Sequence, residues 1–238
     1  GCIGPAKASD SYLHQEARLT VAQATGCDGV HPGYGFLSEN ADFADACAQR
    51  GLTFIGPSGD AIRRAGSKSA AKTRMQQAGV PVTPGSQGPV ESVEAAQAVA
   101  ESVGYPVLLK ASAGGGGRGI RRVYGPEELP EAFESARAEA VACFGNGEMY
   151  LEKLILRPRH IEVQILADRH GHVISLGDRD CSVQRRNQKL LEEAPAWGLS
   201  AELRKEMGQA AVRAAKAVGY ENAGTVEFLL DPDGQHFY

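Results

Sequence analysis

Residues 110–121 constrain the fold more than any other part of this sequence, because they set four consecutive glycines between cationic side chains. The segment reads Lys-Ala-Ser-Ala-Gly-Gly-Gly-Gly-Arg-Gly-Ile-Arg and directly follows an apolar run, residues 105–109, that is typical of a buried strand. Glycines have no Cβ atom, so their backbone N–H groups can approach a polyanion closely. Lys110 and Arg118 add positive charge at the two ends. The pattern predicts a phosphate-binding loop; a flexible surface turn is the alternative.

Composition excludes several classes of protein. The 238 residues include 25 basic and 29 acidic side chains, which gives a net charge of −4 at pH 7. The basic residues cluster locally, which argues against a nucleic-acid-binding protein. No apolar run reaches the roughly 20 residues needed to cross a bilayer, so we expect no membrane association. The five cysteines are odd in number and lack Cys-x-x-Cys spacing, so we expect a cytoplasmic protein without a disulfide framework or a zinc site.

Strand and helix signals alternate along the chain, which predicts a mixed α/β and α+β fold. The order of a helix (11–25), a strand (28–30), a helix with Ser38 as N-cap (38–50) and a strand (53–55) indicates parallel pairing in part of a doubly wound domain. Further helices are predicted at 67–78, 93–103, 127–142 and 201–218, and further strands at 106–110, 120–124, 149–153, 159–167, 172–176, 225–230 and 236–238.

The domain organisation follows from these elements and from the stiff connector at residues 81–85. We expect four parts: a partial N-terminal domain (1–57), a helical linker (58–83), a small lid (84–154) and a partial C-terminal domain (155–238). The first strand and glycine-rich turn of a doubly wound domain are not found, and the last residues resemble a strand cut at its centre. We therefore expect a fragment of a longer polypeptide.

Two polar segments are candidates for ligand binding. Glu152 and Lys153 lie at the exit from the predicted lid, where backbone groups can contact an adenine edge; an ordinary exposed charge pair is the alternative. Residues 178–189 follow an apolar strand and hold three arginines and a lysine, which can bind phosphate or a small oxyanion. A solvated basic loop explains the second segment equally well.

Other candidates lie further from the glycines. Glu227 stands among apolar residues on a predicted buried strand, where either Mg²⁺ or a salt bridge would compensate its charge. His31, Tyr34 and Glu39 follow the strand at 28–30, and open α/β sheets bind ligands at the carboxyl edge of their strands. A purely structural turn remains the alternative there.

Taken together, four stretches resemble the biotin carboxylase family of the ATP-grasp superfamily. The stretches are residues 31–40 (HPGYGFLSEN), 105–119 (YPVLLKASAGGGGRG), 159–168 (RHIEVQILAD) and 179–189 (RDCSVQRRNQK), and they lie in the family's order and spacing. The resemblance covers essentially the whole chain. It implies an ATP-grasp fold preceded by part of the family's N-terminal domain. The implied activity is that of an ATP-dependent ligase, which uses ATP to activate bicarbonate as carboxyphosphate and carboxylates N1′ of biotin.

The resemblance also implies site residues and partners. Lys68 and Lys110 match the ATP-contacting lysines, Gly115, Gly116 and Gly117 the glycines over the phosphates, Glu152, Lys153 and Ile155 the adenine hinge, and His160, Gln184 and Asn187 the ribose- and phosphate-side contacts. Lys189 matches the catalytic lysine that holds bicarbonate, Glu227 a glutamate that binds Mg²⁺ or Mn²⁺, and Tyr34 and Glu39 the biotin side. The implied partners are a biotin carboxyl carrier protein, a carboxyltransferase and a second copy of the complete protein.

Two positions depart from the family pattern. Asn187 stands where many members have histidine, and Trp197 replaces a common proline. The Glu-x-Asn-x-Arg segment, which follows this region in the family, lies outside the sequence, so we expect no carboxylation by the 238 residues alone. Another ATP-grasp ligase, such as a carbamoyl-phosphate synthetase-like enzyme, and a non-catalytic nucleotide-binding module remain alternatives. The final acceptor of the carboxyl group stays open.

Overall fold

The computed structural model describes residues 1–66, 68–112, 119–185 and 188–238, with only the backbone described for Lys68 and Ser69. The chain divides into two compact units. The first contains residues 1–79, 162–179 and 200–227, and the second contains residues 80–161, 180–199 and 228–238. The predicted four-part division of the chain stays a prediction.

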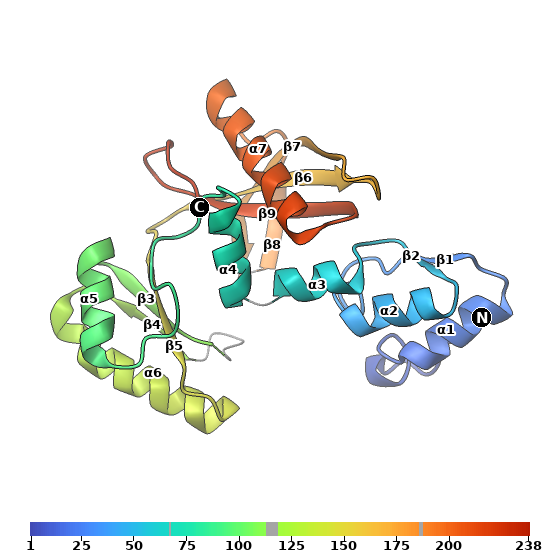
Figure 1. Ribbon diagram of the computed structural model, residues 1–238, viewed down its shortest axis with the longest axis horizontal. Coiled ribbons are helices and arrows are strands. Elements are labelled where there is room, and N and C mark those ends of the chain that lie inside the picture. Colours follow the sequence, from blue (N-terminus) through green and yellow to red (C-terminus); the bar gives the residue numbers. More distant parts are fainter. Residues whose placement is uncertain (67, 113–118, 186–187) are drawn as a thin grey trace. The chain divides into compact units, whose positions relative to one another are not determined.

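The first unit begins with alternating helices and short strands (Figure 1). A 3₁₀ helix (Ala8–Asp10) precedes α1 (Gln15–Ala24), β1 (Gly29–Val30), α2 (Ala41–Gln49) and β2 (Thr53–Phe54). The strands β1 and β2 pair in parallel, as predicted. Their helices bury a small core of Leu19, Ala22, Leu37, Phe43, Cys47 and Leu52.

Two helix starts in this region differ from the sequence-based prediction. Helix α1 begins at Gln15 rather than at residue 11, because His14 accepts a hydrogen bond from the N–H of Ala17 and caps the helix. Helix α2 has Asn40 as its N-cap rather than Ser38; the side chain of Asn40 accepts from the N–H of Phe43 at 2.8 Å. Asparagine caps a helix as well as serine does, so the local sequence did not distinguish the two positions.

Three further helices belong to the first unit. They are α3 (Gly59–Gly66), α4 (Lys68–Gln77) and α7 (Ala201–Val218). Helix α7 carries a long apolar face and is capped by the side chain of Ser200. The guanidinium group of Arg74 on α4 donates to the carbonyl of Ala217 on α7. The range predicted as a helical linker (58–83) contains α3 and α4, and α4 is hydrogen-bonded to α7.

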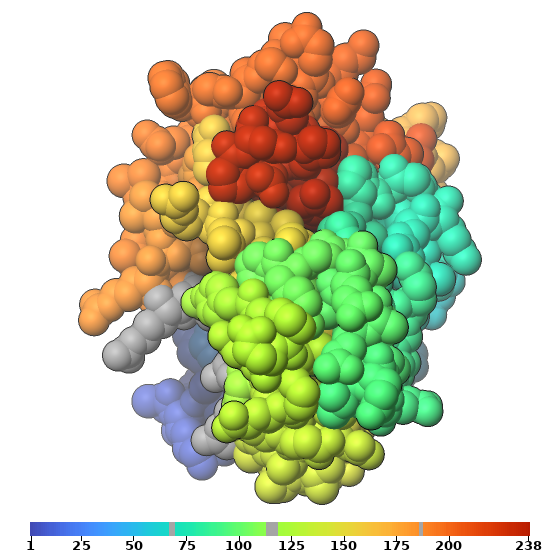
Figure 2. Space-filling model, turned by 90° about the vertical axis from the view of Figure 1, so that its left-hand side faces the viewer, coloured from blue at the N-terminus to red at the C-terminus, as the bar shows by residue number. Residues whose placement is uncertain are grey.

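The second unit contains a three-stranded antiparallel sheet with two helices on one face (Figure 1). The strand order is β4 (Ile120–Val123), β3 (Val107–Ala111), β5 (Met149–Lys153). The helices are α5 (Val93–Val103) and α6 (Leu129–Phe144), the latter preceded by a 3₁₀ turn (Pro126–Glu128). The surfaces of α5, in green, and α6, in yellow-green, adjoin in Figure 2.

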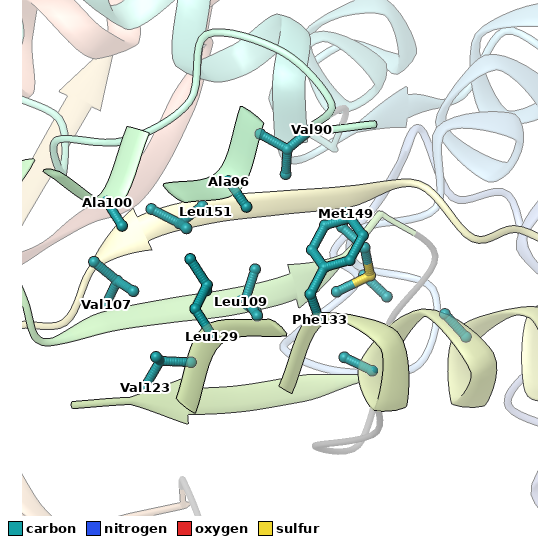
Figure 3. Packing of buried hydrophobic residues seen from close by; sticks show 13 residues of the cluster. Val90, Ala96, Ala100, Val107, Leu109, Val123, Leu129, Phe133, Met149 and Leu151 are labelled. Carbon is teal, nitrogen blue, oxygen red and sulfur yellow. The ribbon is translucent and has the colours of Figure 1, made fainter. Parts of the chain in front are cut away.

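The core of this sheet and its helices follows from the two-residue period of the strands. Alternate residues Val107, Leu109 and Ala111 of β3 point to the helices and are buried. Figure 3 shows Leu109 and Leu151 side by side, with Leu129 and Phe133 of α6 beside them. Cross-strand partners lie on the same face of a sheet, so the residues between them face the other way. This alternation separates the core from the opposite, polar face of the sheet.

A four-stranded sheet has the order β8 (Gln188–Glu193), β7 (Val173–Arg185), β6 (Arg159–Ala167), β9 (Asn222–Leu230). Strand β7 extends nine residues past the predicted end at residue 176. The polar run at 178–189 is therefore strand on both sides of residues 186–187, rather than loop. Backbone hydrogen bonds between Leu229 and Tyr238 form the predicted final hairpin.

Candidate nucleotide-binding site

One face of the three-stranded sheet carries polar side chains and is not covered by α5 or α6. Lys110 of β3 lies opposite Tyr150 of β5 and Ile120 of β4, and Leu108 lies opposite Glu152. All five alternate with core residues, so they share the face away from the helices. The sequence of β3 thus gives a hydrophobic side that holds the unit together and a side that is open to a ligand.

The ammonium group of Lys110 and the carboxylate of Glu152 form an ion pair on this open face. The Nζ–Oε2 distance is 2.6 Å, and the two side chains are 41% and 23% exposed. A partly exposed lysine can exchange a carboxylate partner for a phosphate oxygen with little rearrangement. Lys110 is therefore suitably placed for an anionic ligand, and Glu152 pairs with Lys110 on this face while Lys153 is engaged elsewhere.

Lys153 points to the opposite side from its neighbour Glu152. Its ammonium group donates to the carbonyls of Gly104 (2.9 Å) and Tyr105 (2.8 Å), after the end of α5. Its own N–H donates to the carbonyl of Pro84. The Lys153 side chain therefore ties β5 to the end of α5. Since its N–H is bound to Pro84, its carbonyl is the group left for the hinge contact that the sequence suggested.

The residues that follow the end of β5 offer backbone groups to a flat ligand. Ile155 is buried at 8% exposure. Within the described part of the chain, neither its N–H nor its C=O makes a backbone hydrogen bond. The N–H of Leu154 is bound to the carbonyl of Pro106. The predicted hinge thus offers the backbone of Ile155, next to an apolar side chain.

The two ends of the glycine segment lie beside each other. The N–H of Ala111 donates to the carbonyl of Gly119, and the N–H of Ser112 donates to the carbonyl of Glu148. Gly119 has φ +68°, and a Cβ atom there would lie 2.7 Å from the Cβ of Ala111. This end requires glycine for both conformation and space. Gly115, Gly116 and Gly117 lie outside the described residues.

Ion pairs between β6 and β7 use several of the motif residues. Both Nε and a terminal nitrogen of Arg159 contact Asp180 Oδ2, at 2.9 and 2.8 Å. Burial alone would raise the pKa of Asp180, but hydrogen bonds from Ser182 and Arg159 outweigh it, and the pKa lies below its ordinary value of 3.8. Nearby, Nε of Arg179 donates to Glu162 at 2.6 Å.

These pairs correct one expectation from the sequence. Arg179 was counted among the cations available to an anion, yet it is engaged with Glu162, which is only 4% exposed. A buried carboxylate needs a cationic partner, and the guanidinium group provides it. Of the other cations in this run, Arg186 lies outside the described residues, Arg185 is exposed and Lys189 is half-buried.

The remaining nucleotide-side candidates lie on the same strands. His160 is a half-buried residue of β6 whose N–H donates to the Ser182 hydroxyl. Gln184 of β7 lies directly opposite Lys189 of β8, so the pairing of these two strands brings two predicted site residues together. Asn187 and the side chain of Lys68 lie outside the description.

Glu227 and the biotin-side candidates are open to solvent. Glu227 was expected on a buried strand, and this was wrong: Thr225 and Glu227 are exposed, and the buried residues of β9 are Phe228 and Leu230. Tyr34 is 96% exposed and Glu39 is exposed in the turn before α2. Burial, with a smaller contribution from Glu39, raises the pKa of Tyr220 at the end of α7.

Sequence reasoning missed the contacts of Glu139, near the glycine segment, and of the Trp197 carbonyl, beside the β7–β8 hairpin. Glu139 on α6 accepts from Gly119 and Arg121, and the carbonyl of the exposed Trp197 accepts from Arg159 at 2.6 Å. No local signal separates Glu139 from the other glutamates of its helix. Its position is apparent only when α6 is packed on β4.

Comparisons with known proteins cover both parts of the chain. Residues 67–238 match the family model described as carbamoyl-phosphate synthase L chain, ATP binding domain. Residues 1–62 match the model described as biotin carboxylase, N-terminal domain. A curated relative, biotin carboxylase 1 of Bacillus subtilis, is 54% identical over 237 residues, which is 100% of this chain and 53% of the relative.

Solved structures of high similarity have the same fold. The Campylobacter jejuni biotin carboxylase–beta-gamma-ATP complex matches with a TM-score of 0.86 and 52% identity, over 100% of this chain and 53% of that one. The biotin carboxylase domain of Hydrogenobacter thermophilus 2-oxoglutarate carboxylase, in complex with MgADP, ADP and bicarbonate, matches with a TM-score of 0.82 and 50% identity, over 98% and 51%.

The described helices include none that is both long and apolar enough to cross a membrane. The chain spans about half the length of the curated relatives it matches. The fold is that of the ATP-grasp biotin carboxylase structures, preceded by part of their N-terminal domain. The chain therefore belongs to the biotin carboxylase family and carries the ATP-binding domain of that family.

Proposed function

We propose that the complete protein is an ATP-dependent biotin carboxylase, which uses MgATP and bicarbonate to carboxylate biotin on a carrier. The observation that carries this proposal is the cation of Lys110 on the open face of the three-stranded sheet, on the strand β3 that leads directly into the glycine segment. The MgADP and bicarbonate bound in the relative from Hydrogenobacter thermophilus support it.

The nucleotide would lie on the open face of the sheet. Lys110 and Lys68 would neutralise phosphate charge, and the backbone N–H groups of Gly115, Gly116 and Gly117 would bind phosphate oxygens. The backbone from Glu152 to Ile155 would bind the adenine edge, since Lys153 uses its side chain elsewhere. His160, Gln184 and Asn187 would contact the ribose and phosphates. The cation of Lys110 and the hinge backbone beside the apolar Ile155 occur in one unit, which supports a nucleotide as the ligand.

The acceptor side would use other residues. Lys189 would hold bicarbonate near the phosphate to be transferred, and Gln184 lies across from it. The carboxylate of Glu227 is exposed and suits a hard cation, Mg²⁺ or Mn²⁺, which would supply charge neutralisation of the phosphates when bound. Tyr34 and Glu39 would lie toward biotin. In this scheme the protein residues bind and orient the substrates and offset charge in the transition state.

Assembly and compartment are further parts of the proposal. A biotin carboxyl carrier, a carboxyltransferase and a second copy of the complete protein would be its partners, with cytoplasm as the compartment. Some relatives of similar sequence are chloroplastic or mitochondrial, so the proposed compartment rests on the composition of the chain and not on its similarity to relatives. Relatives also differ in the acceptor, which leaves that choice to experiment.

The test is ADP release by the complete gene product with MgATP and bicarbonate, with and without free biotin. Stimulation by biotin, accompanied by carboxybiotin, is the expected result. Nucleotide turnover that ignores biotin would instead favour another ATP-grasp ligase, which the carbamoyl-phosphate synthase name of the matched model keeps open. Nucleotide binding without any ADP would favour a non-catalytic module.

A further inference from the structure

We infer that Ser182 is a positioning residue for His160, one of the residues proposed to contact the nucleotide. The inference rests on the proposed function, because it assumes that His160 contacts ATP. The backbone N–H of His160 on β6 donates to the Ser182 hydroxyl on β7 at 2.9 Å. That hydroxyl in turn donates to Oδ1 of Asp180, which also accepts the N–H of Ser182. The hydroxyl therefore connects the backbone at His160 to a carboxylate.

The carboxylate in this network is itself fixed. Asp180 is 13% exposed, and both of its oxygens are engaged, Oδ1 by Ser182 and Oδ2 by two nitrogens of Arg159 at 2.9 and 2.8 Å. Arg159 also donates to the carbonyl of Trp197 at 2.6 Å. That contact uses only the main chain of Trp197, whose side chain is 85% exposed, so a proline there would offer the same acceptor. Asp180 is thus a stationary acceptor for the Ser182 hydroxyl.

The pairing of β7 with β8 is irregular at this point. The register of β7 against β8 shifts between Asp180 and Val183, and again between Val183 and Gln184. A bulge of this kind disrupts the ladder of backbone hydrogen bonds and lets a strand bend. Ser182 lies inside the shifted stretch, and its side chain reaches across to β6. The side-chain network therefore holds β6 against β7 where the other neighbour of β7 fixes it less well.

Holding the backbone at His160 also directs its ring. Consecutive side chains leave a strand on opposite faces, so the ring of His160 points away from the face on which Arg159 meets Asp180. Its direction follows the orientation of the peptide group whose N–H is bonded to Ser182. A ring that is held in place before the ligand arrives binds it with a smaller ordering cost. Ser182 is on the Asp180 side, so its effect on ATP should pass through His160.

The experiment is a double-mutant cycle in the complete gene product. It compares the unaltered protein, Ser182→Ala, His160→Ala and the double variant by their KM for ATP in biotin-stimulated ADP release. We expect Ser182→Ala to raise this KM about three- to tenfold, the range for one lost hydrogen bond, with kcat at saturating ATP nearly unchanged. In the His160→Ala background the same substitution should change KM less than about twofold, because no ring remains to be positioned.

Two controls test whether the hydroxyl group is responsible. Ser182→Thr keeps the hydroxyl at an exposed strand position that suits a β-branched residue, and it should resemble the unaltered protein. Ser175→Ala removes a hydroxyl from another exposed position of β7, one that has no hydrogen-bond partner among the described residues. Its KM for ATP should also be normal.

Two results would overturn this inference alone: an unchanged KM for ATP in Ser182→Ala, or an equal rise in KM with and without His160. The second result would make the network a brace for β6 and β7 only. If Ser182→Ala does not fold, Arg159→Lys enters the same cycle, because lysine keeps the charge but cannot bind Asp180 and the Trp197 carbonyl in the same way. It should show the same dependence on His160, and an effect independent of His160 would again overturn the inference.

Two further results would reach beyond Ser182. A normal KM for ATP in His160→Ala would overturn the contact given to His160, and this inference with it. Absence of biotin-stimulated ADP release by the unaltered protein would overturn the proposed function itself.

Discussion

The ammonium group of Lys110 lies 2.6 Å from the carboxylate of Glu152, on the one face of the three-stranded sheet that α5 and α6 leave open. The pair leaves the cation 41% exposed, so it can reach a ligand without first being uncovered. Charge on this face is therefore available for binding and is not needed for the core.

Replacing Lys110 with alanine should weaken ATP binding by about 1.5–3 kcal/mol, the range for a hydrogen bond to a charged group. Isothermal titration of the complete gene product with ATP measures this directly. Lys205→Ala, at an exposed position of α7, is the control and should bind ATP normally. Equal affinities of Lys110→Ala and the unaltered protein would rule out the role given to Lys110.

Replacing Gly119 with alanine should destabilise the protein by about 2 kcal/mol or more, because two costs combine. The residue has φ +68°, which L side chains resist, and its new Cβ would meet that of Ala111 at 2.7 Å. Gly145→Ala is the matched control: it has φ +69° but nothing within 4 Å, so only the conformational cost of about 1 kcal/mol applies. Urea unfolding measures both, and equal losses would contradict the steric part.

Asp180→Asn should lower the free energy of unfolding by about 1–3 kcal/mol at pH 7, since it removes a charge held by Arg159 and Ser182. The pKa of Asp180 is lowered in the folded state. Its contribution is therefore complete above the ordinary value of 3.8 and is lost as the pH falls through the folded value. Urea unfolding between pH 7 and pH 3 should show the two proteins converging only below about pH 4.

Asp60→Asn provides the comparison for Asp180. Asp60 pairs with Arg64 on the surface of α3 and is 69% exposed, so its loss should cost at most about 0.5 kcal/mol. The free energies of unfolding of Asp180→Asn and the unaltered protein could instead differ by the same amount at pH 3 and below as at pH 7. That result would show that the shape of the Asp180 side chain, rather than its charge, stabilises the fold.

Phe133→Ala should destabilise the second unit by about 3–5 kcal/mol, because it removes a fully buried ring from between α6 and the sheet. Val141→Ala, at a 52% exposed position on the same helix, should cost less than about 0.5 kcal/mol. Thermal unfolding of both variants tests the prediction. Similar melting temperatures would mean that the core is less tightly packed than the structure indicates.

Much of the fold could be predicted because its signals are local. The helix Val93–Val103, the strand Met149–Lys153, the strand Arg159–Ala167 and the helix Ala201–Val218 all have the predicted bounds. The bounds of these elements are set by a serine N-cap, by a glycine after the helix or by the alternation of buried and exposed residues in a strand. All three signals lie in residues that are close in sequence. The family was predicted for a related reason, because its motifs are contiguous in sequence.

The parts that could not be predicted depend on distant residues. The pairing of Arg179 with Glu162 joins two strands, and the bonds from Gly119 and Arg121 to Glu139 join a strand to a helix. The exposure of Glu227 likewise depends on what lies against β9, which apolar neighbours in sequence do not reveal. The roles given to the site residues remain predictions until the proposed assays are made.

Glu152 and Lys153 are adjacent in sequence, yet their side chains leave β5 in opposite directions. Natural variation at the two positions should consequently have separate effects. A change at Glu152 can alter ligand preference while the unit keeps its fold. A change at Lys153 removes the donor to the carbonyls of Gly104 and Tyr105, so its first effect should be a lower yield of folded protein. Ligand specificity on the open side of β5 can thus change in evolution while the stabilising contacts on its other side are kept.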